Sequence, residues 1–273
     1  MLNSNFPLDK KSIHRLATRG LSPDVIRSQL DESLELTLEL WRGQGLDITR
    51  KQGYFFFTTK FIPIDDVEFC IVDIETNGSK LDKHQIIEIA AVKVINGVIT
   101  DRFESLVQCD TINEHIVEIT GITVEDTIDA PKLKNVLHDF YNFLGDAIFI
   151  AHDVKFDYKF ISGSFEQVGL EPILNRSLCS LALAERTIVS YRYALSYLSK
   201  QFNLNPNASH HRAMSDVMTT FELFKLSLKN CTENINNAED LIKFSKEAPR
   251  LKRPKFDPML ELNESESQES ISE

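Results

Sequence analysis

The sequence predicts an α/β fold in which helices pack on a mixed sheet. An antiparallel meander comes first: the apolar segment 67–74 is followed by segments 85–95 and 98–107, which Asn96-Gly97 joins. Asn-Gly between two apolar runs is a strong signal for a two-residue β-hairpin turn. Strand and helix patterns then alternate toward the C-terminus, which is typical of a mixed sheet covered by helices.

Before the meander, residues 1–66 are expected to form a small helical and hairpin extension. Apolar residues recur at helical spacing over 9–18 and over 23–41, where Gly43 would end the second helix. The basic stretch 50–53 separates two apolar runs, which predicts a hairpin. This order matches a winged helix in outline. A packing or protein-contact extension is an equally good interpretation, because the segment is only slightly basic.

The core domain is expected to span residues 67–230. After the meander, its pattern predicts a short buried strand at 147–151 and helices at 131–144, 154–168, 193–202 and 213–228.

Residues 231–273 read as a tail. Prolines punctuate a basic stretch from Lys243 to Lys255, and an acidic, serine-rich end follows. The low hydrophobicity after Leu262 favours disorder there. The basic stretch is a candidate tether for a partner protein such as a DNA polymerase subunit.

Composition limits the class of protein. With 273 residues, of which 42% are hydrophobic, the chain can hold one α/β domain and a small appendage. Residues 1–11 contain no apolar stretch of the kind found in signal peptides. Apolar runs such as 54–57 are too short to cross a bilayer. The four cysteines form no Cys-x-x-Cys pair. We therefore expect a cytoplasmic protein with no membrane contact.

The net charge of −11 argues against broad binding of nucleic acid through the overall electrostatic field. Residues 257–273 contain six acids and no bases, so much of this charge is concentrated at one end. An acidic enzyme can still act on nucleic acid if bound cations neutralise its site.

Three short acidic motifs carry the functional signal. The first is Asp73-Ile74-Glu75-Thr76, at the end of an apolar strand. Asp73 and Glu75 are two residues apart, so both side chains leave the same face of a strand. A carboxylate that ends an apolar strand is costly to desolvate unless it is paired or bound to metal. Alone, this spacing is common on exposed strands.

The second motif runs from His152 to Asp157. It ends the short buried strand and enters the next helix, at the sheet edge where open α/β sheets place ligands. Phe156 is expected to point into the core and Asp157 outward toward that edge. A purely structural interpretation would make Asp153 an N-cap and Asp157 a favourable charge at the helix N-terminus.

The third motif runs from His211 to Asp216. These two residues are five apart, about 140° around a helix, so they would not share one face. The easier arrangement places Asp216 on the helix and His211 on the loop before it. An imidazole there can accept a proton near neutral pH. The adjacent His210 could compete for this role.

Together the motifs resemble the DEDDh branch of the DnaQ-like 3′–5′ exonucleases, which includes the epsilon proofreading subunit of bacterial DNA polymerase III. Asp73 and Glu75 match the first family motif, Asp157 the second, and Asp216 the third, with His211 five residues ahead. The resemblance covers about residues 67–228 and implies a ribonuclease H-like fold. Position 153 is Asp where the family often carries Asn.

The resemblance also implies chemistry. Asp73, Glu75, Asp157 and Asp216 would hold two divalent ions, Mg²⁺ or Mn²⁺, and His211 would deprotonate the attacking water. Oxygen ligands suit such hard cations better than zinc.

For its substrate, the resemblance implies nucleic acid 3′ ends, most readily single-stranded or frayed DNA. Thr76 and Gly78 would contact the terminal nucleotide. Two alternatives remain: an enzyme that acts on RNA ends or short oligonucleotides, and a non-catalytic scaffold that binds a polymerase.

Overall fold

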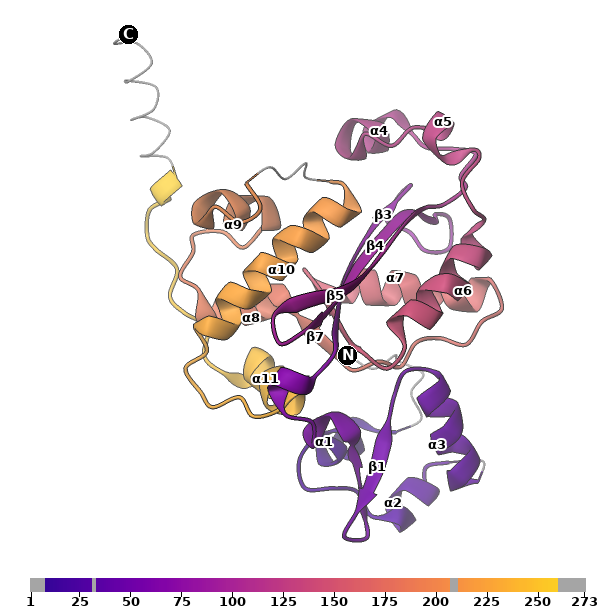
Figure 1. The fold of residues 1–273 in the computed structure, drawn as a ribbon, viewed down its shortest axis with the longest axis vertical. Coiled ribbons are helices and arrows are strands. Elements are labelled where there is room, and N and C mark those ends of the chain that lie inside the picture. Colours follow the sequence, from indigo (N-terminus) through magenta and orange to yellow (C-terminus); the bar gives the residue numbers. More distant parts are fainter. Residues whose placement is uncertain (1–7, 31–32, 207–210, 260–273) are drawn as a thin grey trace.

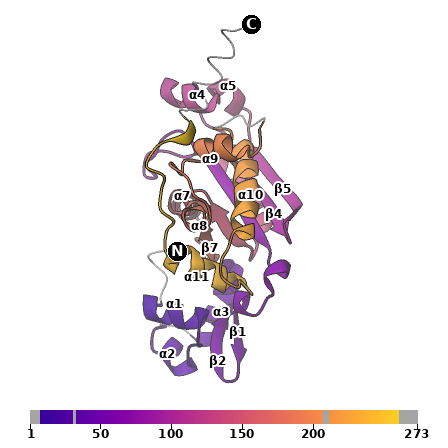
Figure 2. The same ribbon diagram turned by 90° about the vertical axis from the view of Figure 1, so that its left-hand side faces the viewer.

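The computed structural model describes residues 8–30, 33–206 and 211–259. These residues form a large sheet with helices on both faces, and a smaller N-terminal module at one end (Figures 1 and 2). The large sheet has the strand order β5-β4-β3-β6-β7. Its strands are β3 (Phe69–Thr76), β4 (Ile86–Ile95), β5 (Val98–Leu106), β6 (Ile148–Ala151) and β7 (Ser177–Cys179).

The predicted meander is confirmed. β3 pairs antiparallel with β4, and β4 pairs antiparallel with β5 across the Asn96-Gly97 turn. On its other edge β3 pairs in parallel with β6, which pairs in parallel with β7. The carboxyl ends of β3, β6 and β7 therefore lie along one edge of the sheet.

Alternating side chains of β3 serve two hydrophobic cores. Cys70, Val72 and Ile74 face helices α6 (Leu133–Leu144) and α7 (Val154–Gln167). Phe69 and Ile71 face α10 (Ala213–Lys229) and α11 (Ala238–Glu247) on the opposite side. Because side chains alternate along a strand, the next residues on the α10 side are Asp73 and Glu75. Four further helices complete the domain: α4 (Glu114–Thr120), α5 (Val124–Thr127), α8 (Ser180–Thr187) and α9 (Leu195–Phe202).

The N-terminal module has its own core, formed by residues such as Leu16, Ile26, Trp41 and Phe57. Its elements are α1 (Lys10–Ala17), α2 (Pro23–Arg27), α3 (Leu34–Gly43), β1 (Ile48–Lys51) and β2 (Tyr54–Phe57). The single helix expected over 23–41 is wrong. Two helices form instead, because Ser33 accepts a hydrogen bond from the Leu36 N–H and caps a new helix.

The module docks near the amino ends of β6 and β7. The Leu174 N–H donates to the Gln44 carbonyl over 2.7 Å, and Leu174 joins the core of the module. Just before β7, the buried Arg176 pairs with Glu239 of α11, and its guanidinium lies 4.2 Å from the ring centroid of Phe57. The module therefore sits at the end of the sheet away from the carboxyl ends of the parallel strands (Figure 1).

The expected tail at 231–273 is wrong for its first part. Leu241, Ile242 and Phe244 of α11 are buried against the sheet. Arg250 and Arg253 then pair with the largely buried carboxylate of Glu185. Lys243 and Lys246 on this helix, with Lys252 and Lys255 after it, dominate the composition and hide the apolar face of the helix. The disorder expected after Leu262 lies outside the described residues.

Among the described residues, no helix is long and apolar enough to cross a membrane.

Candidate metal centre and active site

The first motif ends β3. Asp73 and Glu75 are half-buried and leave the face that α10 covers. Glu75 lies directly opposite Glu88 in the register between β3 and β4. Like charges paired across strands are unfavourable unless a cation neutralises them. Thr76 follows at a shift in this register.

The second motif lies at the same edge of the sheet as Asp73 and Glu75, but on the helix that covers the other face. Asp157, in the first turn of α7, is 4% exposed, whereas Phe156 is 41% exposed. The expectation that Phe156 points inward and Asp157 outward is wrong. Asp153, before the helix, adopts a left-handed φ of 64° and forms no side-chain cap hydrogen bond. This abrupt turn rotates the start of α7 so that Asp157 faces the sheet.

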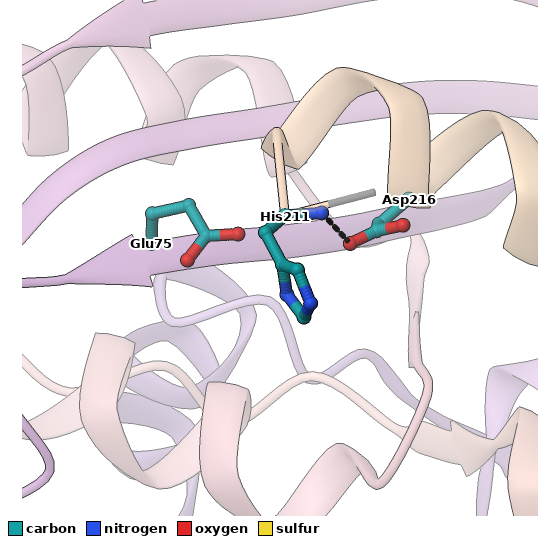
Figure 3. A group of neighbouring side chains, drawn as sticks. All are labelled: Glu75, His211 and Asp216. Atoms are coloured by element: carbon teal, nitrogen blue, oxygen red, sulfur yellow. Dashed lines mark hydrogen bonds between the residues drawn. The ribbon is translucent and has the colours of Figure 1, made fainter. Parts of the chain in front are cut away.

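The third motif stands at the start of α10. His211 has a left-handed φ of 65°, and its backbone N–H donates to Oδ2 of Asp216 over 3.1 Å. The side-chain ligand atoms of Glu75, His211 and Asp216 all lie within 4.8 Å of one another. Figure 3 shows the imidazole projecting from the loop between the two carboxylates. His210 lies outside the described residues.

Glu88 is a residue that the motif analysis did not single out for the site. Its side chain is almost fully buried and accepts hydrogen bonds from Arg212 Nη2 at 2.7 Å and from the Ala213 N–H at 2.9 Å. The bond to the Ala213 N–H satisfies a free donor at the start of α10. Glu88, which lies opposite Glu75 on β4, therefore holds Arg212 and the start of α10, and this fixes the position of the adjacent His211. A buried acid within an otherwise apolar strand was the available signal.

Two other motif residues have structural contacts. His152 bonds to Ser180 Oγ at 3.0 Å and to the Tyr193 carbonyl at 2.8 Å, which ties the end of β6 to α8 and to the approach to α9. Gly78 has a φ of 154°, and a Cβ atom there would lie 2.6 Å from the His84 ring. Glycine at 78 is thus required by packing, whether or not it contacts a nucleotide.

The carboxylates raise one another's pKa values. Burial, followed by the charges of Asp157, Asp216, Glu75 and Glu88, raises the pKa of Asp73 well above its ordinary value. Burial and the nearby acids raise the pKa of Glu75 to about 8, and burial raises the pKa of Asp157 to about 7. Such a cluster favours protons or cations over empty carboxylates.

This cluster predicts how metal-free stability depends on pH. A carboxyl group whose pKa is higher in the folded protein stabilises the fold fully below its unfolded pKa, and this contribution is lost as pH rises through its folded pKa. For Glu75 and Asp157 the window runs from their ordinary pKa values of 4.5 and 3.8 to about 8 and about 7. We expect the melting temperature in chelator to fall by roughly 5 °C between about pH 6 and pH 8.5.

Calorimetry at both pH values, with and without Mg²⁺, measures this effect. Mg²⁺ should raise the melting temperature more at the higher pH, and Glu75→Gln should flatten the dependence. A metal-free melting temperature that stays constant or rises over this interval contradicts the cluster.

Comparison with known proteins agrees with this geometry. The family model described as exonuclease (RNase T) matches residues 70–224, more than half of the chain. The chain belongs to the RNase T exonuclease family. The match spans β3 to α10 and thus includes all three acidic motifs. The resemblance to DnaQ-like exonucleases is confirmed.

A relative of this exonuclease is the PolC-type DNA polymerase III of Halalkalibacterium halodurans, with 38% identity over 176 residues. The match covers 63% of this chain and 12% of the relative, so the chain corresponds to a small part of that polymerase.

Solved exonucleases share the fold. Exonuclease X in complex with 5′ overhanging duplex DNA aligns with a TM-score of 0.52 and 27% identity, covering 65% of this chain and 99% of that one. Exonuclease I aligns with a TM-score of 0.55 at 18% identity, covering 60% and 41%. The ribonuclease H-like fold expected from the sequence is confirmed.

Because Glu88 holds the start of α10, its substitution should act on the site from a distance. Glu88→Gln keeps the shape but places an amide against Arg212 and the Ala213 N–H. We expect exonuclease turnover to fall by about 10- to 100-fold, as for other residues that orient metal ligands. Glu39→Gln on α3 is the matched control. Turnover within twofold of wild type would contradict a positioning role for Glu88.

Proposed function

We propose that this exonuclease cleaves nucleoside monophosphates from DNA 3′ ends, with two divalent ions, Mg²⁺ or Mn²⁺, in its active site. The observation that carries this proposal is the convergence of three sequence-distant motifs on the carboxyl edge of the sheet. Asp73 and Glu75 come from β3, Asp157 from α7, and His211 with Asp216 from the start of α10.

The residues fit divalent cations. Four carboxylates supply hard oxygen donors, and the raised pKa values of Asp73, Glu75 and Asp157 reflect negative charge that a cation would neutralise. Asp73, Glu75, Asp157 and Asp216 would hold the ions. When bound, two such ions stabilise the attacking and leaving oxygens of a phosphodiester displacement.

We assign proton transfer to His211. Its side chain is exposed, so substrate and water can reach the ring, while its backbone N–H bond to Asp216 holds it beside the carboxylates. In this role the free ring nitrogen accepts the proton of the water that attacks the terminal phosphodiester, and it then releases that proton to solvent.

The structure offers a place for the substrate strand. A groove of about 780 Å³ lies between segment 79–82 and the outer face of α7, beside the end of β3. Lys80, Lys159 and the exposed ring of Phe156 line it, together with Asp82 and Glu166. We propose that the terminal nucleotide contacts Thr76 and Gly78, and that the preceding nucleotide enters this groove.

Biological roles follow from the relatives. The PolC match supports proofreading during replication in association with a polymerase subunit, and the complex of exonuclease X with 5′ overhanging duplex DNA supports action at DNA ends, as repair requires. Both roles require the same 3′–5′ reaction, so the reaction can be tested first.

The test is degradation of oligonucleotides labelled at the 5′ end, with Mg²⁺, Mn²⁺ or Zn²⁺. Single-stranded DNA, a duplex with a mismatched 3′ end and RNA of the same sequence are compared. We expect a ladder that shortens from the 3′ end, fastest on single-stranded and mismatched DNA with Mg²⁺ or Mn²⁺.

Other outcomes point to the alternatives. Faster cleavage of RNA would favour an exoribonuclease that acts on short oligonucleotides. Immediate release of the 5′ label as a mononucleotide would reverse the polarity. If no metal supports hydrolysis although Mg²⁺ raises the melting temperature, a non-catalytic scaffold is the better interpretation.

A further inference from the structure

The N-terminal module has the element order of a winged helix. After α1, Leu21 forms an antiparallel bridge to Phe55 of β2, and α2, α3 and the β1–β2 hairpin follow. In this arrangement the third helix often contacts nucleic acid. Here, however, α3 exposes Glu35, Leu36, Glu39 and Leu40, and its acids would repel phosphate. Helix α3 is therefore poorly suited to binding nucleic acid.

The β1–β2 hairpin, unlike α3, exposes basic and aromatic side chains. Its register places Ile48, Arg50, Phe55 and Phe57 on one face, of which all but Arg50 are buried. The outer face carries Thr49 and Lys51 opposite Phe56 and Tyr54. Phe61 packs edge-on against Phe56, with ring centroids 5.3 Å apart. We call Lys51, Tyr54, Phe56 and Phe61 the hairpin patch.

The hairpin patch combines exposed rings with positive charge. Tyr54 is 49% exposed and Phe61 38% exposed. Lys51 lies between them: it is the cross-strand neighbour of Tyr54, and its Nζ is 3.8 Å from the ring centroid of Phe61. A cation flanked by two rings matches the alternation of phosphates and bases along a single strand.

Charge around the patch supports the same ligand. Segment 48–62 contains three bases (Arg50, Lys51 and Lys60) and no acid, in a chain whose net charge is −11. Within the described ranges, none of these three bases forms an ion pair with an acid. Arg50 and Lys51 lie over the rings of Phe55 and Phe61, but no acid offsets their charge, which is therefore available to neutralise phosphates.

The patch is also preorganised. The turn residues Gln52 and Gly53 both have positive φ, which fits the tight two-residue hairpin and fixes the register. Phe56 packs over Gly20, where a Cβ atom would lie 2.5 Å from its Cζ. The hairpin backbone and the Phe56 ring, against which Phe61 packs, are therefore in place before any ligand binds, which reduces the entropy lost on binding.

We propose that the hairpin patch binds single-stranded nucleic acid by stacking bases on Tyr54 and Phe61 around a phosphate at Lys51. It lies beyond the amino end of β3, at the opposite end of the sheet from Asp73 and Glu75 (Figure 1). The eight residues of β3 alone span about 25 Å, or about seven stacked nucleotides. The patch thus holds a distal part of a long strand, and it would retain that strand independently of the catalytic centre.

The test measures binding of a 30-nucleotide oligo-dT and of a six-nucleotide one by fluorescence anisotropy, in chelator so that no hydrolysis occurs. Tyr54→Ala combined with Phe61→Ala removes the rings, and Lys51→Glu reverses the charge. Phe256→Ala, which removes a ring that is 81% exposed outside the patch, and Lys134→Glu on α6 are the matched controls.

We expect the double variant to raise the Kd for the 30-nucleotide strand by at least about fivefold, the lower end of the range for losing the stacking of one base. Lys51→Glu should lower the salt slope of log K by at least about 0.7, the value for one phosphate contact on a single strand. The control variants should bind as wild type does. Turnover of the six-nucleotide strand with Mg²⁺ should stay unchanged, because it reaches only the catalytic edge.

Kd values for the patch variants within twofold of the controls overturn the proposal and leave the module as a surface for protein partners. Absence of wild-type binding to the long strand at low salt overturns it as well. The proposed reaction fails separately: if wild type cleaves nothing but binds the long strand through the patch, the exonuclease proposal falls and this one stands.

Discussion

Asp73→Asn is expected to reduce hydrolysis by at least about 10³-fold, because it removes one of the carboxylates that would hold the two proposed ions. Asp73 occupies the middle of the cluster: the charges of Asp157, Asp216 and Glu75 all raise its pKa. The amide has nearly the same volume, so packing against α10 should be preserved. Single-turnover hydrolysis of a labelled strand at saturating Mg²⁺ measures the loss.

The same variant has an opposite effect on stability. Removing one of several buried like charges should raise the melting temperature of the metal-free protein at about pH 8 and weaken its increase with Mg²⁺. Asp146→Asn, an exposed carboxylate after α6, is the matched control and should change neither quantity. If Asp73→Asn keeps near-wild-type turnover, these carboxylates are not the catalytic centre.

His211→Asn should slow hydrolysis by about 10²- to 10⁴-fold, the usual contribution of a positioned general base. Asparagine is chosen because His211 has a φ of 65°, and asparagine tolerates this left-handed conformation better than alanine does. The backbone N–H bond to Asp216 can then persist, and only the imidazole is lost.

This experiment also separates two roles for the ring. The ligand atoms of His211 lie within 4.8 Å of those of Glu75 and Asp216, so the ring could bind metal instead of moving a proton. A general base predicts a lower kcat with an unchanged Mg²⁺ requirement, whereas a metal ligand predicts that more Mg²⁺ is needed. His210→Ala and His138→Ala are the controls. Equal losses from His210→Ala and His211→Asn would contradict the assignment of the base.

Residue spacing alone was sufficient for much of the fold. The apolar run before Asp73, the Asn96-Gly97 turn and the long periodic stretches predict the meander, α6, α7 and α10, because hydrophobic period and turn chemistry are local properties. The short strand β7 and helix α8 were missed. β7 has only three residues and is defined by its pairing with β6, which is not a local property.

The predictions of a single helix over 23–41 and of a tail from residue 231 failed for the same kind of reason. Helical spacing continues from 23 to 41, yet the chain forms two helices because Ser33 caps the second. Lysines made α11 resemble a solvated tail, although one face of it is buried on the sheet and Glu239 within it pairs with Arg176. The helical spacing of Ala238, Leu241 and Ile242 was the available signal for this buried face.

For the site, residue order is enough to place Asp73 and Glu75 on one face of a strand, since side chains alternate along any strand. The burial of Asp157 and the exposure of Phe156 depend instead on the three-dimensional fold, because the left-handed turn at Asp153 sets the rotation of α7. The fold also places His211 beside Asp216, through a backbone turn and the hold of Glu88 on the start of α10. The bond from the Ala213 N–H to Glu88 joins segments far apart in the chain, so its formation depends on the packing of the whole sheet.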